Sequence, residues 1–74
     1  MTYFITRGII EGSSDNIYVG ESGVDAEQVA RVYVQEMDEQ EMPATAVVEK
    51  WHNGVRVSSI EFDSDGIVDF TLAD

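Results

Sequence analysis

The chain has 74 residues, of which 15 are Asp or Glu and only 4 are Lys or Arg, giving a formal net charge of -11 at pH 7. Its hydrophobic content of 43% is too high for a disordered acidic tail, so we expect one small folded domain over residues 1-74. The absence of cysteine excludes disulfides, thiolate nucleophiles and thiolate metal sites. Four scattered cations exclude direct binding to nucleic acid or to an anionic membrane surface.

The hydropathy of the chain predicts a cytoplasmic protein. No apolar run approaches the roughly 18 residues of a membrane-spanning helix, and the first residues lack a basic segment followed by a long hydrophobic one. A strongly acidic chain attracts cationic partners, including metal ions, basic peptides and the nucleic-acid channels of other proteins. Adaptation to a salt-rich cytoplasm is an alternative explanation of the same composition.

The first third of the chain predicts a hairpin. Residues 2–11 are rich in β-branched and aromatic side chains, which favours a strand, bent or bulged near Gly8. The polar cluster at residues 12–16 predicts a turn, and a second strand follows at residues 17–19.

A helix is predicted from Ala26 to about Gln40, ending before Pro43. Asp25 and Gln28 fit a variant of the capping box, and Val24 and Val29 fit a hydrophobic staple around it. The residues expected to face the sheet recur at helical spacing: Ala26, Val29, Ala30, Tyr33 and Met37.

The last third predicts a three-stranded antiparallel meander over residues 44–52, 55–62 and 67–72. Asn53-Gly54 predicts a type I′ turn, which pairs His52 with Val55 and Trp51 with Arg56. Continued without interruption, this register pairs Val47 with Ile60 and Thr45 with Phe62. A three-residue loop ending at Gly66 then pairs Phe62 with Val68, Ile60 with Phe70 and Glu61 with Asp69. The helix-facing set becomes Val47, Trp51, Ile60, Phe62, Val68, Phe70 and Leu72.

The predicted fold is therefore α+β: a single antiparallel sheet covered on one face by one helix, in the order β-β-α-β-β-β. Because one helix covers one face, Val48, Val55 and Val57 are predicted to form an apolar stripe on the other face, where a homodimer or adaptor interface is the alternative function.

Carboxylates gather at two places where they oppose stability, the end of the helix and the last hairpin. Such violations of local rules are expected at functional sites. The predicted partner-binding residues are Glu27, Glu36, Asp38, Glu39, Glu41, Glu61, Asp63, Asp65 and Asp69.

Other chemistry finds little support in the sequence. The spacing of Asp63, Asp65 and Gly66 fails the calcium-loop pattern, and His52 is the only histidine. Neither a metal nor another cofactor is expected, and no nucleophile–histidine–acid set exists, so we expect no enzyme activity. Paired carboxylates perform acid–base chemistry only in a pocket that raises one pKa.

The order of the elements resembles that of small phage-encoded proteins. The resemblance covers the layout of the whole chain, including the helix opening Gly23-Val24-Asp25-Ala26-Glu27-Gln28-Val29-Ala30 and the turn Asn53-Gly54. Among these proteins the chain is similar to anti-CRISPR and anti-restriction inhibitors, some of which are acidic mimics of DNA. The resemblance implies an inhibitor in the host cytoplasm that binds the basic nucleic-acid-binding surface of a CRISPR effector or restriction complex.

Overall fold

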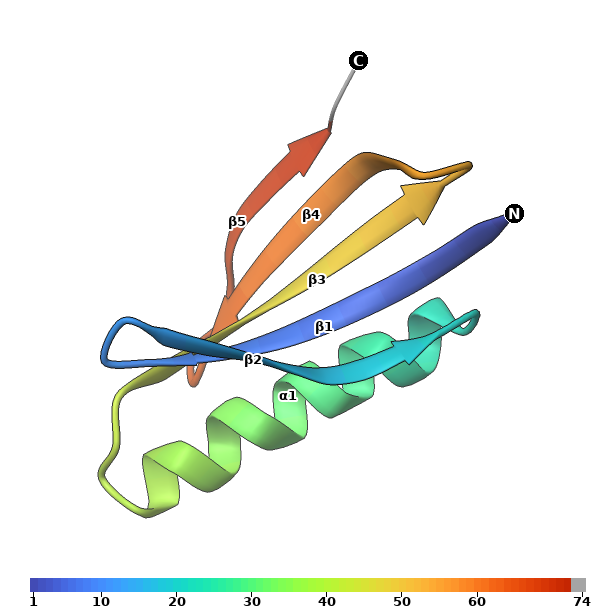
Figure 1. Ribbon diagram of the computed structural model, residues 1–74. Helices are drawn as coiled ribbons and strands as arrows, with labels where there is room; N and C mark the ends of the chain where they lie inside the picture. Colours follow the sequence, from blue (N-terminus) through green and yellow to red (C-terminus); the bar gives the residue numbers. More distant parts are fainter. Residues whose placement is uncertain (73–74) are drawn as a thin grey trace.

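In the computed structural model, one antiparallel sheet is covered on one face by one helix (Figure 1). The structure describes the backbone of residues 1–72 and the side chains of residues 1–66. The elements are β1 (Thr2–Ile10), β2 (Ser13–Gly20), α1 (Gly23–Glu39), β3 (Ala44–His52), β4 (Val55–Asp63) and β5 (Gly66–Leu72). The strands lie in the order β2-β1-β3-β4-β5. The predicted α+β class, with a single antiparallel sheet and one helix, is confirmed.

The first hairpin is tighter than predicted. Glu11 and Gly12 form a two-residue turn with φ values of 49° and 83°, which match a type I′ turn. The predicted five-residue turn at residues 12–16 is wrong, because residues 13–16 pair with β1 as part of β2. An irregularity was predicted near Gly8, and the register does shift close by, between Thr6 and Arg7, but the extra residue is Ile17 of β2.

Gly8 instead lets the helix approach the sheet. It pairs regularly with Asp15 on one side and Ala46 on the other. The ring of Tyr33 lies directly over it, so that a Cβ atom on Gly8 would come within 2.4 Å of two ring carbons. The absence of a side chain is what makes room for the ring.

The helix begins three residues earlier than predicted. Ser22 is the N-cap, and its side-chain oxygen accepts a hydrogen bond of 3.2 Å from the backbone N–H of Asp25. The predicted cap at Asp25 is therefore wrong. The predicted staple fails with it, because Val24 is 75% exposed and lies in the first turn of the helix.

The meander follows the predicted register only next to its first turn. Asn53 and Gly54 have positive φ values of 51° and 81°, and the pairs His52–Val55 and Trp51–Arg56 form as predicted. A bulge beyond Trp51 then shifts the register by one residue. As a result Val48 pairs with Ile60, and Ala46 pairs with Phe62, in place of the predicted Val47–Ile60 and Thr45–Phe62 pairs.

A second bulge lies between β4 and β5. Glu61 pairs with Asp69 and Ile60 with Phe70, as predicted. Phe62 pairs with Ile67 and not with Val68, because the turn contains only Ser64 and Asp65 and the pairing shifts after Glu61. The predicted three-residue loop is therefore wrong, although Gly66 does have a positive φ of 124°.

The extra residue in β4, Val57, changes which residues of β3 lie on the helix-facing side relative to the prediction. Thr6, which is fully buried, donates a hydrogen bond of 2.9 Å to the carbonyl oxygen of Ala26, so its side of the sheet faces the helix. Val48 pairs with Thr6 and lies on that side. The predicted stripe of exposed valines therefore loses Val48, which is only 5% exposed, whereas Val55 is 62% exposed and Val57 is half-buried.

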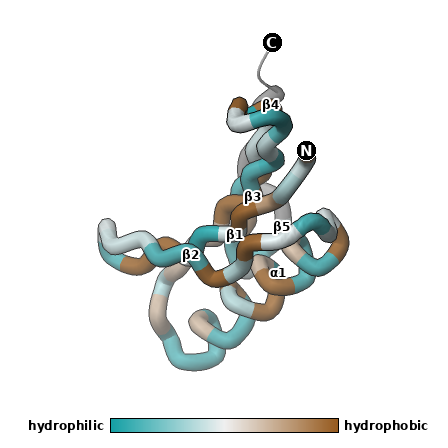
Figure 2. The backbone as a smooth tube through the Cα atoms, turned by 45° about the vertical axis from the view of Figure 1, so that its right-hand side comes forward, coloured by the Kyte–Doolittle hydropathy of each residue, from teal (hydrophilic) through white to brown (hydrophobic). Residues whose placement is uncertain are grey.

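Small residues let the helix lie close to the central strands, and Figure 2 shows hydrophobic positions gathered where the two layers meet. The buried hydrophobic core is Ala26, Ala30, Val34, Ala46, Val48 and Phe62. Of the predicted helix-facing residues, Val29, Tyr33 and Met37 are half-buried, and the prediction missed Val34. Val47 and Trp51 belong to the other face of the sheet. The side chains of Val68, Phe70 and Leu72 lie outside the described residues.

Candidate partner-binding surface

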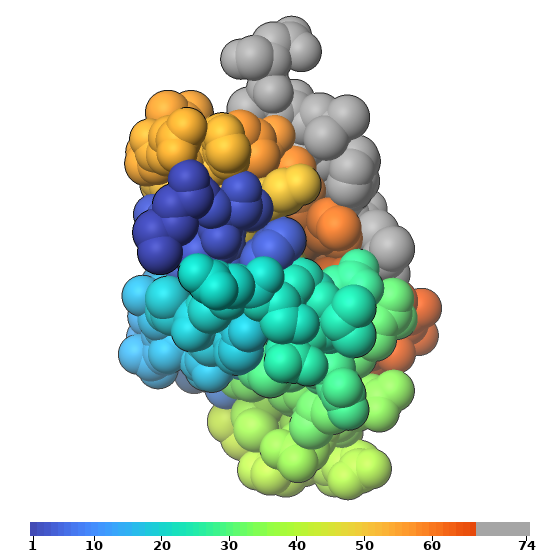
Figure 3. All heavy atoms as spheres, turned by 90° about the vertical axis from the view of Figure 1, so that its right-hand side faces the viewer, coloured from blue at the N-terminus to red at the C-terminus, as the bar shows by residue number. Residues whose placement is uncertain are grey.

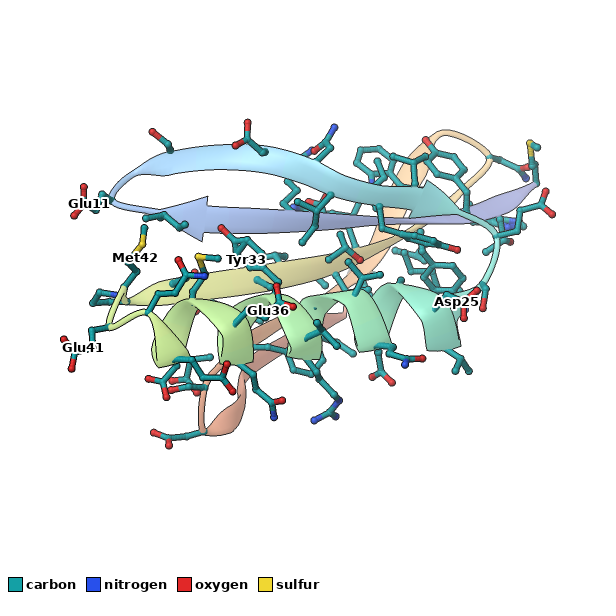
Figure 4. The ribbon with its side chains drawn as sticks, turned by 90° about the horizontal axis from the view of Figure 1, so that it is seen from below. Glu11, Asp25, Tyr33, Glu36, Glu41 and Met42 are labelled. Carbon is teal, nitrogen blue, oxygen red and sulfur yellow. The ribbon has the colours of Figure 1, made fainter. Side chains whose placement is uncertain are left out.

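Three turns lie toward one end of the molecule and carry acidic residues, with the β1–β2 and β4–β5 turns at opposite edges of the sheet. The β1–β2 turn, the C-terminal end of α1 and the β4–β5 turn all lie away from the N-terminus (Figure 1). Figure 4 shows Glu11 and Glu41 at this same end. We call the exposed carboxylates of these three turns the acidic end: Glu11, Asp38, Glu39, Glu41 and Asp65.

Just beyond the end of α1, Glu41 has a backbone conformation that normally calls for glycine. The N–H of Glu41 donates to the carbonyl of Asp38 (3.0 Å), and the N–H of Met42 donates to that of Met37 (2.9 Å). These are the two hydrogen bonds of a Schellman motif. Its C′ residue, Glu41, has a φ of 58°, in the left-handed region where a Cβ atom is unfavourable. The last turn of the helix contains no basic residue that would complement its dipole.

Glu11 repeats the same local conflict. It holds the first position of the type I′ turn with a φ of 49°, where Asn, Asp or Gly is preferred. The equivalent position of the second type I′ turn carries Asn53, a favoured residue. Two glutamates in the left-handed region thus lie at one end of the molecule, and strained backbone of this kind gathers at functional sites.

We predict that relieving this strain stabilises the protein. Glu41→Gly and Glu11→Asn should each raise the free energy of unfolding by about 0.5–1 kcal/mol, because each removes a left-handed glutamate and one negative charge. Urea denaturation followed by circular dichroism measures the change. Glu21→Asn, at an exposed position with a negative φ, is the control and should leave the stability within about 0.5 kcal/mol. Lower stability in both turn variants would contradict the prediction.

The β4–β5 turn lies beside the helix. A small hollow of about 150 Å³ is lined by Arg31, Val34 and Gln35 of α1 and by residues 62–66. Asp63 is half-buried, and one of its carboxylate oxygens accepts a hydrogen bond of 2.8 Å from the backbone N–H of Asp65. The guanidinium of Arg31 stacks over the Phe62 ring, 5.0 Å from its centre. The structure therefore brings Asp63 and Asp65 of the predicted hairpin group beside the helix, toward the same end as the carboxylates of its C-terminus.

Four of the predicted residues lie apart from the acidic end. Glu27 is half-buried near the start of the helix, beside a hollow that it lines with Lys50. Glu61 pairs with Val47 on the face of the sheet away from the helix. Asp69 pairs with Glu61 through the backbone, and its side chain lies outside the described residues. Glu36 projects from the side of the helix near Tyr33 (Figure 4). The sequence analysis did not predict Glu11 as a site residue, because the pair Glu11-Gly12 is only a weak signal for a turn.

The arginines on the helix-free face neutralise a different carboxylate. Glu49 is only 4% exposed and lies between Arg7, at 3.2 Å, and Arg56, at 3.1 Å. Beside this cluster the rings of Tyr3 and Trp51 stack with their centres 6.2 Å apart. Among the side chains that the structure describes, these two ion pairs are the only ones. The described cations therefore do not pair with the carboxylates of the acidic end.

At the opposite end of the molecule, hydrogen bonds join the N-terminus to the β3–β4 turn. The terminal amino group of Met1 donates a hydrogen bond of 2.7 Å to the side chain of Asn53, and the backbone N–H of Asn53 donates to the carbonyl of Met1. Figure 3 shows the N-terminus, the β3–β4 turn and the start of α1 on this side. This end also carries carboxylates, since Glu21 and Asp25 are exposed beside the start of α1.

Within residues 1–66, no three side chains of His, Asp and Glu come together in a way that would hold a metal ion. The described part of the chain also has no helix with the length and apolar character needed to cross a membrane. No family model, curated protein or solved structure matches the chain.

Proposed function

We propose that the protein is a non-catalytic inhibitor that binds, through its acidic end, a basic nucleic-acid-binding surface of another protein. The resemblance to phage-encoded inhibitors makes a CRISPR effector or a restriction complex the proposed partner, in the cytoplasm of a host cell. The observation that carries the proposal is the placement of Glu11 and Glu41 in left-handed backbone at one end, next to Asp38 and Glu39.

Physical arguments support this assignment. Duplex DNA carries one charge per roughly 1.7 Å of its axis, and the channels that bind it are lined by Lys and Arg. Carboxylates that have no internal ion pair remain available for arginine forks of such a channel. A rigid scaffold of sheet and helix holds them in place, which limits the entropy lost on binding.

The proposal is tested by reversing charge at the acidic end. Asp38→Lys combined with Glu39→Lys should weaken inhibition of the susceptible complex by at least about tenfold, because each Lys repels the basic channel. Phage plaque counts on strains that each carry one defined CRISPR or restriction system find the complex, and DNA-binding competition with the purified complex measures the effect.

The control is Glu21→Lys combined with Glu27→Lys, which changes the net charge equally but lies near the helix start. It should keep inhibition within about threefold at physiological salt, because screening limits the reach of a charge to about 8 Å. An equal loss of inhibition in the two double variants would mean that inhibition depends on net charge and not on the acidic end. Inhibition that does not weaken with added salt would contradict mimicry.

Salt adaptation, the other explanation of the acidity, makes a separate prediction. A protein that is acidic only as an adaptation to high salt unfolds when the salt is removed, because its carboxylates then repel one another without screening by counterions. Circular dichroism in 10 mM and 2 M KCl distinguishes the two. We expect the folded spectrum to persist at 10 mM, and unfolding there would favour salt adaptation.

A further inference from the structure

A groove runs between the edge of the sheet and the helix, distinct from the acidic end. It measures about 530 Å³ and is lined by Ile17 and Tyr18 of β2 and by a stripe of α1: Asp25, Gln28, Val29, Val32, Tyr33 and Glu36. The helix residues recur every three or four positions, so they form one continuous side of the helix. Figure 4 shows Asp25, Tyr33 and Glu36 along the side of α1 that faces the β1–β2 hairpin.

One wall of the groove is an unpaired strand edge. β2 stands first in the strand order, so within the described part of the chain its outer edge has no neighbouring strand. The backbone groups of such an edge are a template for another extended chain. The first half of β2 is exposed and polar, but Ile17 and Tyr18 turn apolar surface to the groove.

The floor of the groove is apolar and its two ends are acidic. Val32 is 45% exposed here. The residues that the helix contributes to the core, Ala26, Ala30 and Val34, lie on another side of it. Asp25 lies at one end of the groove and Glu36 at the other, about 16 Å apart along the helix axis at 1.5 Å per residue. No Lys or Arg occurs among the described residues that line it.

Asp15 adds negative charge beside the same groove. It pairs with Gly8, beneath the Tyr33 ring, and so belongs to the helix-facing side of β2. Burial raises the pKa of the Tyr33 hydroxyl above its usual value of 10.0, and the nearby charge of Asp15 raises it further. The tyrosine therefore stays neutral at physiological pH, and the charge of the groove is negative.

We propose that this groove binds an extended segment of a partner protein, which pairs with the outer edge of β2 and places apolar side chains between two basic ones. Alternate residues of a strand point to the same side, and six residues span about 20 Å. A segment with Lys at positions 1 and 7 and Val at positions 3 and 5 therefore reaches Asp25 and Glu36 with its lysines and contacts Val29 and Val32 with its valines. A second copy of the chain fits poorly, because β2-to-β2 pairing would bring the acidic rims together.

The probe for this proposal is a blocked heptapeptide, Lys-Thr-Val-Thr-Val-Thr-Lys, titrated into the isotopically labelled protein. Amide shift changes should map to residues 13–20 and to the groove side of α1. Val32→Asn should weaken binding about five- to tenfold by removing apolar contact. The matched control is Val24→Asn, another exposed valine of the same helix that lies outside the groove, and it should change the affinity less than twofold.

Two modified peptides separate strand pairing from simple charge attraction. A heptapeptide methylated on alternate backbone nitrogens keeps its lysines and valines but cannot pair with a strand, and its binding should be undetectable. A peptide with Glu in place of Lys should bind at least tenfold more weakly. Equal binding of the methylated peptide, or shift changes that avoid β2, would overturn the proposal. The Asp38 and Glu39 variants should bind the heptapeptide normally, so this test and that of the acidic end fail independently.

Discussion

Glu49→Leu is expected to lower the free energy of unfolding by about 1–3 kcal/mol, although Glu49 lies on the face of the sheet that the helix leaves open. The carboxylate is 4% exposed, and one of its oxygens accepts a hydrogen bond of 3.1 Å from Arg56. Removing one member of a buried ion pair costs about 3–5 kcal/mol. Here the side chains of Arg7 and Arg56 are 41% and 53% exposed, so water solvates the freed arginines and reduces the loss.

The same cluster predicts an opposite result for a triple variant. The Nε atom of Arg7 and one oxygen of Glu49 are buried without a hydrogen-bond partner, so the cluster carries a desolvation cost that its ion pairs only partly offset. Arg7→Met, Glu49→Leu and Arg56→Met together should restore the stability to within about 1 kcal/mol of the original protein, or exceed it. Urea denaturation of the single and triple variants measures both values, with Glu21→Leu as the exposed control. A triple variant less stable than Glu49→Leu would contradict this view of the cluster.

The sequence predicts a turn correctly where its residues favour the backbone conformation of that turn, and it fails where they do not. Asn53-Gly54 has the turn chemistry that a type I′ hairpin requires, and both residues adopt the expected positive φ. The Glu11–Gly12 turn has the same backbone shape but carries glutamate at the unfavourable position. Residue propensities therefore predicted a turn at residues 12–16, later than the observed one, and a second strand shorter than β2.

The sequence did not predict which side chains of the strands face the helix, because this depends on where the bulges lie. A two-residue turn fixes the register of its neighbours, but the single extra residue in β4, Val57, reverses which side chains of β3 share a face with Ile60 and Phe62. Val47 and Val48 are both apolar, so the hydrophobic pattern does not choose between them. The buried Glu49 was missed for the same reason, since its two arginines come from strands on either side of β3.

The acidic end was partly accessible from the sequence. The carboxylates at the helix C-terminus and in the last hairpin stand where local electrostatics disfavours them, and that signal is readable without a structure. The sequence does not reveal that the β1–β2 turn joins them, because this depends on how the hairpin lies against the helix. Likewise, Ser22 caps the helix where Asp25 has an equally suitable side chain.

A second large effect is expected at Gly8, where the cost comes from a single neighbour. No positive φ is recorded for Gly8, so its backbone accepts an alanine, but the new Cβ would lie 2.4 Å from Cε1 and Cζ of Tyr33. Gly8→Ala should lower the free energy of unfolding by about 1–3 kcal/mol through overpacking. Gly20→Ala is the control. Its Cβ meets the hydroxyl end of Tyr18, which moves more easily, so the loss should be smaller.

A double-mutant cycle with Tyr33 tests whether the ring is the cause. Tyr33→Ala alone removes apolar contact and leaves a gap over Gly8, whereas in the double variant the alanine methyl group at position 8 partly fills that gap. The two changes should therefore couple by about 1–2 kcal/mol in the favourable direction. Tyr33→Phe keeps the ring and should give no such rescue of Gly8→Ala. Additive losses in the Tyr33→Ala cycle, measured by urea denaturation, would mean that Gly8 is required by the strand itself and not by the helix packed against it.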